Sequence, residues 1–254
     1  MHDNHFIITT LKKIKVKNPI LIEGLPGMGN VGKITADFLI AQLKAQRIYE
    51  IRSSLLPNFT FVNQDNLLDT AKLEIAHKKI HNQDFLILTG DAQPVEEQQS
   101  YAFCEYLIDF FTKLQVKEIV TLGGIGLEEE PLKSTVYITG NDLKLLKKHP
   151  KPKPATDILL GPILGMTGLL PALSKQKNLP AISLITETVG QPGYIGAAGA
   201  KALLSYLNDY YKLKLNLNIL HKEIKAIQTA MKDIQEFAEE EHHKGTKEVT
   251  NYIG

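Results

Sequence analysis

Short apolar runs alternate with amphipathic stretches through the first 211 residues of the chain. The runs have the length and composition of buried strands, and the stretches between them carry apolar residues at helical spacing. The expected strands are 20–25, 48–51, 84–90, 118–122, 135–139 and 180–185. The expected helices are 31–43, 96–114, 141–148, 163–176 and 196–211, with Asn141 as the cap of the third. This alternation predicts a three-layer α/β/α domain around a mostly parallel or mixed central sheet, as a single domain over residues 1–212.

Three further segments have weaker strand signals. Residues 59–62 and 71–76 are rich in β-branched and aromatic residues or alternate in polarity, which favours an antiparallel pair beside the main sheet. The apolar patch at Phe6–Ile8 fits either an edge strand or a small helix.

The last part of the chain has a different period. Apolar residues recur there at alternating spacings of three and four, which is typical of a heptad seam. The seam predicts one long helix over 213–245, followed by a loose polar tail at 246–254. The helix packs either on its own domain or against a second subunit. The candidate oligomer-interface residues are Leu217, Leu220, Ile224, Ile227, Met231 and Ile234.

Composition narrows the classes of function. The chain has 254 residues and a net charge of +1, and Arg47 and Arg52 are its only arginines, so no strong field or arginine cluster favours nucleic acid. Cys104 is the only cysteine, which excludes an internal disulfide and favours a reducing cytoplasm. No apolar run reaches the roughly 20 residues of a membrane span. We therefore expect a cytoplasmic protein with no nucleic-acid or membrane partner.

A glycine-rich turn follows the first strand. Gly27, Gly29 and Gly32 have the G-x-G-x-x-G spacing of a dinucleotide-binding turn at a helix N-terminus. Pro26 within the turn and the absence of a second nucleotide-binding half argue against a dinucleotide site. The alternative is that the glycines allow a tight turn and close packing of the helix on the sheet. Lys33 lacks a following Ser or Thr, so the turn is not a P-loop. We expect no cofactor.

Several motifs, taken in order, resemble one known family. Gly24-Leu25-Pro26-Gly27-Met28-Gly29-Asn30-Val31-Gly32 is similar to the opening motif of the proteasome assembly chaperone family, in its archaeal branch. The resemblance covers about residues 15 to 211. The further matching blocks are 89–94, 122–124, 139–141, 161–171, 187–188 and 197–198.

This resemblance implies a fold like that of purine nucleoside phosphorylases, self-association, and a role in assembling the 20S proteasome in place of catalysis. Partners implied in this way are a second copy of the chain and proteasome α subunits. Some archaeal members are thought to dock through a C-terminal hydrophobic-Tyr-any-residue ending. This chain ends Asn251-Tyr252-Ile253-Gly254, which does not match.

A small-molecule site at the strand ends is the alternative. Glu23 and Glu187 would act there as an acid/base pair if they converge, whereas hydrogen bonding to backbone groups of the glycine-rich loops is the simpler role. The ligand-pocket candidates are Glu23, Gly24, Gly27, Gly29, Asp91, Asn141, Glu187 and Thr188. His242 and His243 are adjacent and point in different directions on a helix, so we expect no metal site. Cys104 lies on an apolar helix face, as a core residue does.

Overall fold

A computed structural model describes residues 5–63, 65–129, 131, 133–191 and 193–220. The chain divides into two units, Met1–Leu217 and Asn218–Gly254, and the first contains the sheet and the helices described below. The predicted helix beyond residue 220, with its interface candidates Ile224, Ile227, Met231 and Ile234, lies outside the described residues, as does the tail 246–254.

The first unit is built on a nine-stranded sheet in the order β1-β3-β6-β7-β2-β8-β11-β9-β10. Strands β7, β2, β8 and β11 are parallel to one another, whereas β1, β3 and β6 form an antiparallel flank and β9 runs antiparallel to β11. The strands of this sheet are β1 (Phe6–Thr10), β2 (Ile20–Glu23), β3 (Gln46–Ser53), β6 (Lys72–Ile80), β7 (Gln83–Gly90), β8 (Glu118–Leu127), β9 (Val136–Gly140), β10 (Lys153–Pro154) and β11 (Ala181–Val189).

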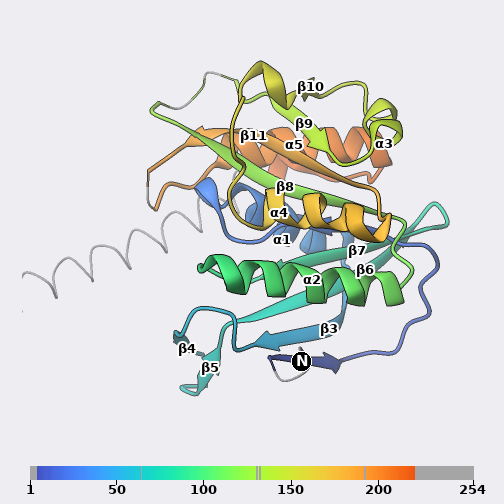
Figure 1. Ribbon diagram of the computed structural model, residues 1–254, viewed down its shortest axis with the longest axis vertical. Helices are drawn as coiled ribbons and strands as arrows, with labels where there is room; N and C mark the ends of the chain where they lie inside the picture. The colour runs from blue at the N-terminus through green and yellow to red at the C-terminus, as the bar shows by residue number, and fades with distance from the viewer. Residues whose placement is uncertain (1–4, 64, 130, 132, 192, 221–254) are drawn as a thin grey trace, which may run out of the picture. The chain divides into compact units, whose positions relative to one another are not determined.

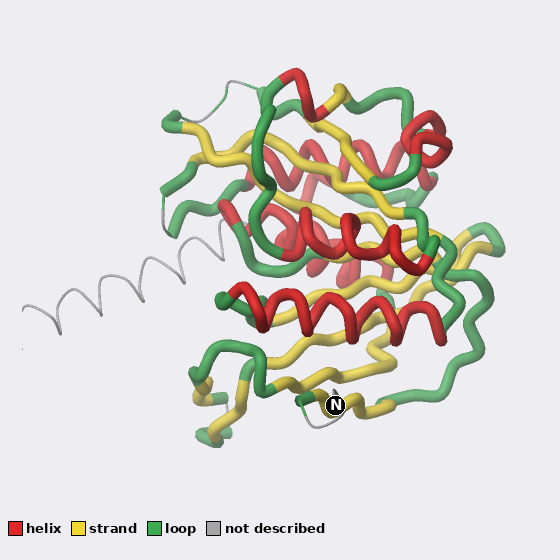
Figure 2. Tube along the Cα trace, in the orientation of Figure 1, coloured by secondary structure: helices red, strands yellow, loops and turns green. Residues whose placement is uncertain are grey.

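Helices cover both faces of the sheet (Figures 1 and 2). One face carries α1 and α5, which contact each other, and the opposite face carries α2 and α4. The helices are α1 (Val31–Leu43), α2 (Glu97–Lys113), α3 (Leu143–Lys148), α4 (Met166–Ser174) and α5 (Ala197–Tyr211). Every residue of β2 is buried, as expected for a central strand covered on both faces. The predicted α/β/α layering around a mixed sheet is confirmed.

Two predictions about individual elements differ from the structure: the partner of segment 59–62 and the cap of the third helix. Segment 59–62 does pair antiparallel, but its partner is β5 (Leu68–Thr70), not 71–76, and β4 (Thr60–Val62) with β5 forms a separate hairpin. Residues 72–80 instead join the main sheet as β6, because their apolar side chains pack against the core under α2. The cap of α3 is Asp142, whose carboxylate accepts a hydrogen bond from the Leu145 N–H at 2.7 Å, and not Asn141.

Strands β8 and β11 extend further at their carboxyl ends than the sequence indicates. The run Gly123-Gly124-Ile125-Gly126 continues β8 in place of ending it, and Glu187 and Thr188 lie inside β11. Helix α5 ends at Tyr211, where Lys212 takes a positive φ of 55° and the Leu213 N–H bonds back to Asn208. Residues 213–216 are therefore irregular, and a 3₁₀ turn at Leu217–Ile219 is the last element among the described residues.

Candidate functional site

The candidate site lies where the parallel strands end, which we call the carboxyl edge of the sheet. Here β2 stops at Glu23, opposite Thr121 of β8, whereas β8 and β11 continue side by side to Leu127 and Val189. The glycine-rich loop, residues 24–32, leaves β2 at this step and turns into α1. Open α/β sheets bind ligands in such crevices at the carboxyl ends of their strands.

The glycines of this loop are required by close packing. A side chain on Gly24 would overlap the carbonyl oxygen of Gly32, so the turn and the first turn of α1 are in direct contact. Gly29 has a φ of 59° and lies against Thr188, and its carbonyl accepts a hydrogen bond from the Gly196 N–H at 2.8 Å. The loop therefore joins α1 to β11 and to the start of α5, as the simpler interpretation of the spacing predicted.

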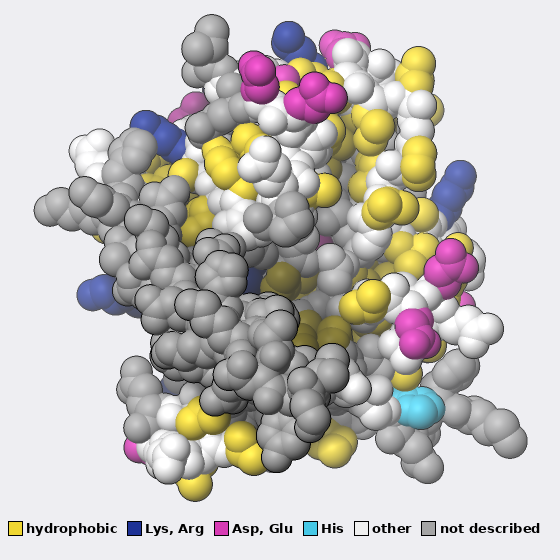
Figure 3. All heavy atoms as spheres, turned by 90° about the vertical axis from the view of Figure 1, so that its left-hand side faces the viewer, with side chains coloured by type: hydrophobic (Ala, Val, Ile, Leu, Met, Phe, Trp, Pro, Cys, Tyr) yellow, Lys and Arg dark blue, Asp and Glu magenta, His cyan; other side chains and the backbone are white. Residues whose placement is uncertain are grey.

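A hollow of about 310 Å³ opens beside the loop, and we call it the glycine-lined hollow. Its walls are mainly backbone and apolar side chains: Gly27 and Met28 from the loop, residues 122–126 of β8, and Leu159 and residues 162–165 of the segment 159–165 that leads into α4. Gln93 and Thr167 are its polar members. Leu160 and Leu164 on that segment are 88% and 85% exposed. Figure 3 views this side of the molecule and shows hydrophobic side chains on its uncovered part, with both acidic and basic side chains at the margin.

Gln93 bridges the two sides of this hollow. Its side-chain amide donates to the Pro26 carbonyl at 2.6 Å and accepts from the Met166 N–H at 2.9 Å, so one residue connects the glycine-rich loop to the start of α4. Gln93 lies in the matching block 89–94 but is not among the predicted ligand-pocket residues. Its position between a buried strand and Pro94 was the only available signal.

Glu23 is fully buried at the end of β2, one residue before the loop. Its Oε1 accepts a hydrogen bond from the Leu25 N–H at 3.1 Å, and its Oε2 has no partner among the described residues. Burial raises the pKa of Glu23 to about 8, against which the single backbone hydrogen bond acts weakly. The carboxyl group is therefore largely protonated at neutral pH.

Glu187 and Thr188 occupy neighbouring positions on β11 but face different surroundings. The carboxylate of Glu187 accepts hydrogen bonds from the Thr135 N–H at 2.6 Å and from the Tyr137 hydroxyl at 2.9 Å. Thr188 is 2% exposed and lies under Gly29. The Glu187 carboxylate thus joins β11 to Thr135 and to Tyr137 of β9, and the Thr188 side chain packs against the glycine-rich loop.

The two glutamates proposed as an acid/base pair do not converge. Glu23 lies level with Ser183 across the sheet, because both face Thr121, and Glu187 is four residues further along β11. At about 3.3 Å per residue and about 4.8 Å per strand, this separates their backbones by about 13 Å along the strands and about 10 Å across them. Each carboxyl group is also bonded to backbone, so the pair is excluded.

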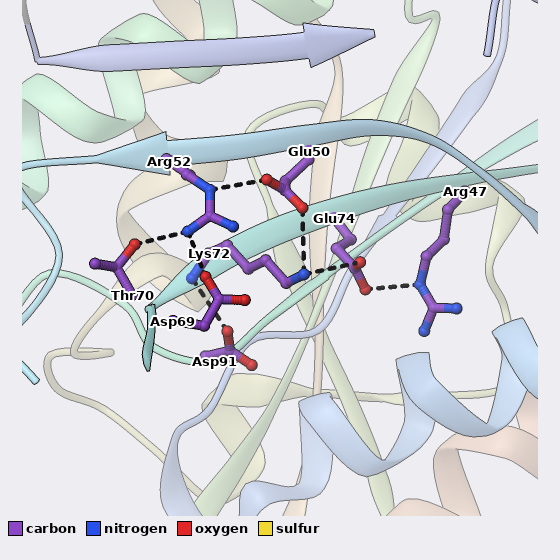
Figure 4. A network of polar contacts seen from close by, with 8 residues as sticks. All are labelled: Arg47, Glu50, Arg52, Asp69, Thr70, Lys72, Glu74 and Asp91. Carbon is purple, nitrogen blue, oxygen red and sulfur yellow. Dashed lines mark hydrogen bonds and ion pairs between the residues drawn. The ribbon is translucent and has the colours of Figure 1, made fainter. Parts of the chain in front are cut away.

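Asp91 belongs to a different site. It follows β7 and accepts a hydrogen bond from the Lys72 N–H at 3.1 Å, at one end of a charge network on the antiparallel flank (Figure 4). In this network, Arg52 contacts Glu50 and Asp69, Lys72 contacts Glu50 and Glu74, and Arg47 contacts Glu74. These charges are neutralised by one another, and Asp91 does not line the glycine-lined hollow.

Asn141 lies at the opposite end of the sheet from the other candidates. Its side chain donates to the carbonyls of Pro171 and Leu179 at 2.7 and 3.1 Å and accepts from the N–H of Ala181, the first residue of β11. All three contacts are with backbone, so Asn141 joins β9, β11 and the end of α4. Of the eight ligand-pocket candidates, only Gly27 lines the hollow itself.

The described residues contain no group of three or more His, Cys, Asp or Glu side chains that could hold a metal ion. His242 and His243 lie outside them. Within the same described part of the chain, no helix combines the length and the apolar composition needed to cross a membrane.

The fold and the site define a three-layer α/β protein whose strand-end hollow is built mainly from backbone and apolar side chains. A model of the PAC2 family matches residues 21–235, and the chain belongs to this family. A protein of Methanocaldococcus jannaschii, MJ0106, is 30% identical over 249 residues, covering 95% of each chain.

Solved structures agree with the fold. The chain is similar to Pyrococcus furiosus PbaB, an archaeal proteasome activator, with a TM-score of 0.79 and 26% identity over 91% of this chain and 99% of that one. It is also similar to Pyrococcus furiosus PbaA, an archaeal homolog of proteasome-assembly chaperone, with a TM-score of 0.73 and 22% identity over 98% of this chain and all of that one.

Proposed function

We propose that this protein is a non-enzymatic, cytoplasmic chaperone of the proteasome-assembly type, which self-associates and binds 20S proteasome α subunits. The observation that carries the proposal is the chemistry of the carboxyl edge. Glu23 and Glu187 each accept a backbone hydrogen bond, and the hollow is lined mainly by backbone and apolar side chains, among them the exposed Leu164. Such a surface suits protein docking better than catalysis.

Membership of the PAC2 family and the likeness to PbaA and PbaB support a proteasome partner. PbaB is a proteasome activator and PbaA is a homolog of a proteasome-assembly chaperone, so the experiments on this protein must distinguish activation from assembly. We expect native mass spectrometry of the protein mixed with α subunits from its own organism to detect a complex. If neither free α subunits nor assembly intermediates bind, the proposal fails.

Activation is measured separately, as peptidase activity of the fully assembled 20S particle. The assembly role predicts faster formation of the particle and unchanged activity once it has formed. A rise in activity of the preassembled particle, without faster assembly, would instead support an activator.

Self-association is proposed to use the heptad seam of residues 217–238. We expect the double variant Ile224→Glu/Ile227→Glu to lower the oligomer mass in light scattering, because two buried charges disrupt an apolar seam. The control Lys225→Glu changes a residue between the seam positions and should leave the mass unchanged. An unaltered mass in the double variant would indicate that the seam packs within one chain.

A further inference from the structure

One wall of the glycine-lined hollow is the backbone of a strand whose neighbour has ended. β2 stops opposite Thr121, and β8 continues to Leu127 with β11 on its other side. Among the described residues, 122–127 of β8 therefore have a neighbouring strand on one side only, and 122–126 line the hollow.

The hydrogen bonds of β8 determine which residues face the open side. The Ile119 N–H donates to the Pro180 carbonyl, and the Leu127 carbonyl accepts from the Gly190 N–H, both on the β11 side. Backbone groups alternate in direction along a strand, so odd-numbered residues of β8 point toward β11. Gly124 and Gly126 consequently direct their N–H and C=O groups toward the side that β2 leaves uncovered.

The residue types at this edge favour the approach of a second backbone. Glycine within a strand often marks a place where a ligand or another chain comes close, because it has no side chain to obstruct the contact. Opposite this edge, Ile163 and Leu164 complete an apolar hollow of about 310 Å³, which has room for one branched side chain. This part of the molecule thus offers strand backbone groups for hydrogen bonding, beside a pocket that accepts one side chain of the bound segment.

The charges on the loops at the carboxyl edge indicate which charge a bound segment should carry. In the described residues of the segments 24–30, 91–97, 128–135, 158–165 and 190–196, and apart from Asp91, which bonds to Lys72, the acidic residues are Glu96, Glu97, Glu128 and Glu129, and the one cation is Lys133. Glu128 and Glu129 directly follow the open part of β8 and are exposed, as are Glu96 and Glu97 at the start of α2. Glu97 also lines an adjoining cavity that shares Ile163 and Leu164 with the hollow. Acidic side chains at this edge, which we call the acidic rim, are complementary to a segment that carries lysine or arginine beside an apolar residue.

We propose that the open edge of β8 binds an extended segment of a partner protein by strand addition, with one branched apolar side chain in the hollow and basic residues beside it. This inference rests on the proposed function, because it names how the partner is recognised. The backbone of the segment forms hydrogen bonds with Gly124 and Gly126. The acidic rim favours basic residues on either side of the apolar one.

The test uses the full-length protein and a fluorescein-labelled nonapeptide of alternating lysine and threonine with leucine at its centre. We expect saturable binding in fluorescence anisotropy. Three comparison peptides should each bind at least about tenfold more weakly: one N-methylated at alternate backbone nitrogens, one with aspartate at the centre, and one with glutamate for lysine. Equal binding of the N-methylated peptide would overturn strand addition.

Protein variants locate the site. Leu164→Glu should weaken the nonapeptide at least about tenfold, whereas Leu143→Glu, the same change at a 75% exposed leucine on α3, should have no effect. Glu128→Lys/Glu129→Lys should also weaken binding, and the exposed control Glu105→Lys should not. All five substituted residues are solvent-exposed, so circular dichroism should show an unchanged fold. Binding unaffected by Leu164→Glu would place the peptide elsewhere and overturn the proposal.

The same variants separate this proposal from the proposed function. If α subunits bind the Leu164→Glu protein as well as they bind the wild type, strand addition at β8 is overturned while the chaperone function stands. If the nonapeptide binds as expected but no α subunit does, the edge is supported and its partner is a different protein. If the nonapeptide lowers the oligomer mass, the edge holds a second copy of the chain, and the partner proposal is overturned.

Discussion

The parallel centre of the sheet and its antiparallel flank belong to one hydrogen-bonded sheet but differ in how they hold charged side chains. In β2 every side chain is buried, and the single carboxylate, Glu23, has one backbone partner and a pKa raised to about 8. In β3 and β6 one face packs under α2 through residues such as Ile51 and Leu73, and the other carries the charge network (Figure 4). Burial on both faces therefore makes the centre sensitive to changes that the flank tolerates.

The largest expected effect tests the packing of the centre. Gly24→Val should prevent folding or destabilise the protein by about 3 kcal/mol or more, because its side chain would overlap the backbone of Gly32. The matched control is Gly161→Val in the segment 159–165, where an added Cβ has its nearest neighbour at 3.7 Å. Denaturant unfolding followed by circular dichroism measures both. Equal stability of the two variants would show that the loop is not tightly packed.

The next effect is the pH dependence at Glu23. The folded state holds this proton up to about pH 8, whereas the unfolded state releases it near 4.5, so the free energy of unfolding falls as pH rises between these values. Glu23→Gln keeps a neutral group of similar shape and should be more stable than the wild type at pH 8.5, by up to a few kcal/mol. At pH 4 the two proteins should differ much less. A difference that does not change with pH would contradict the raised pKa.

The flank should respond to pH in the opposite direction. Although burial opposes it, hydrogen bonds from Arg52 and Lys72 hold the pKa of Glu50 below its usual value. The stability from this group is therefore present above about pH 4.5 and is lost as pH falls through the lowered pKa. Glu50→Gln should lower the free energy of unfolding by about 1 kcal/mol at pH 7, and less at pH 3. A larger loss at pH 3 than at pH 7 would contradict this.

The smallest expected effect is that of salt on the flank. Arg52→Gln removes two ion pairs with partly exposed partners, so it should cost about 1 kcal/mol or less in dilute buffer and still less in 0.5 M sodium chloride. Lys151→Gln removes a more exposed pair, with Asp209, and should have no measurable effect. Thermal unfolding at the two salt concentrations compares them. A cost for Arg52→Gln that is independent of salt would indicate packing and not charge.

The pattern of apolar runs was sufficient to predict the layers of the fold, because burial on two faces leaves a continuous signal in each central strand. It also predicted that the glycine spacing serves close packing. Segment 71–76 was paired with the wrong strand, since alternation shows that one face is buried but not which element buries it.

What the sequence determined by itself is the set of elements, their α/β order and the tight turn after the first strand. Only the tertiary structure decided that Gly123–Gly126 extends β8. A run of glycines is equally compatible with a turn and with a strand that lies close to the backbone of another segment. The separation of Glu23 from Glu187 and of Asn141 from the carboxyl edge was likewise decided by strand register and direction. Register depends on contacts between distant segments, which local composition does not encode.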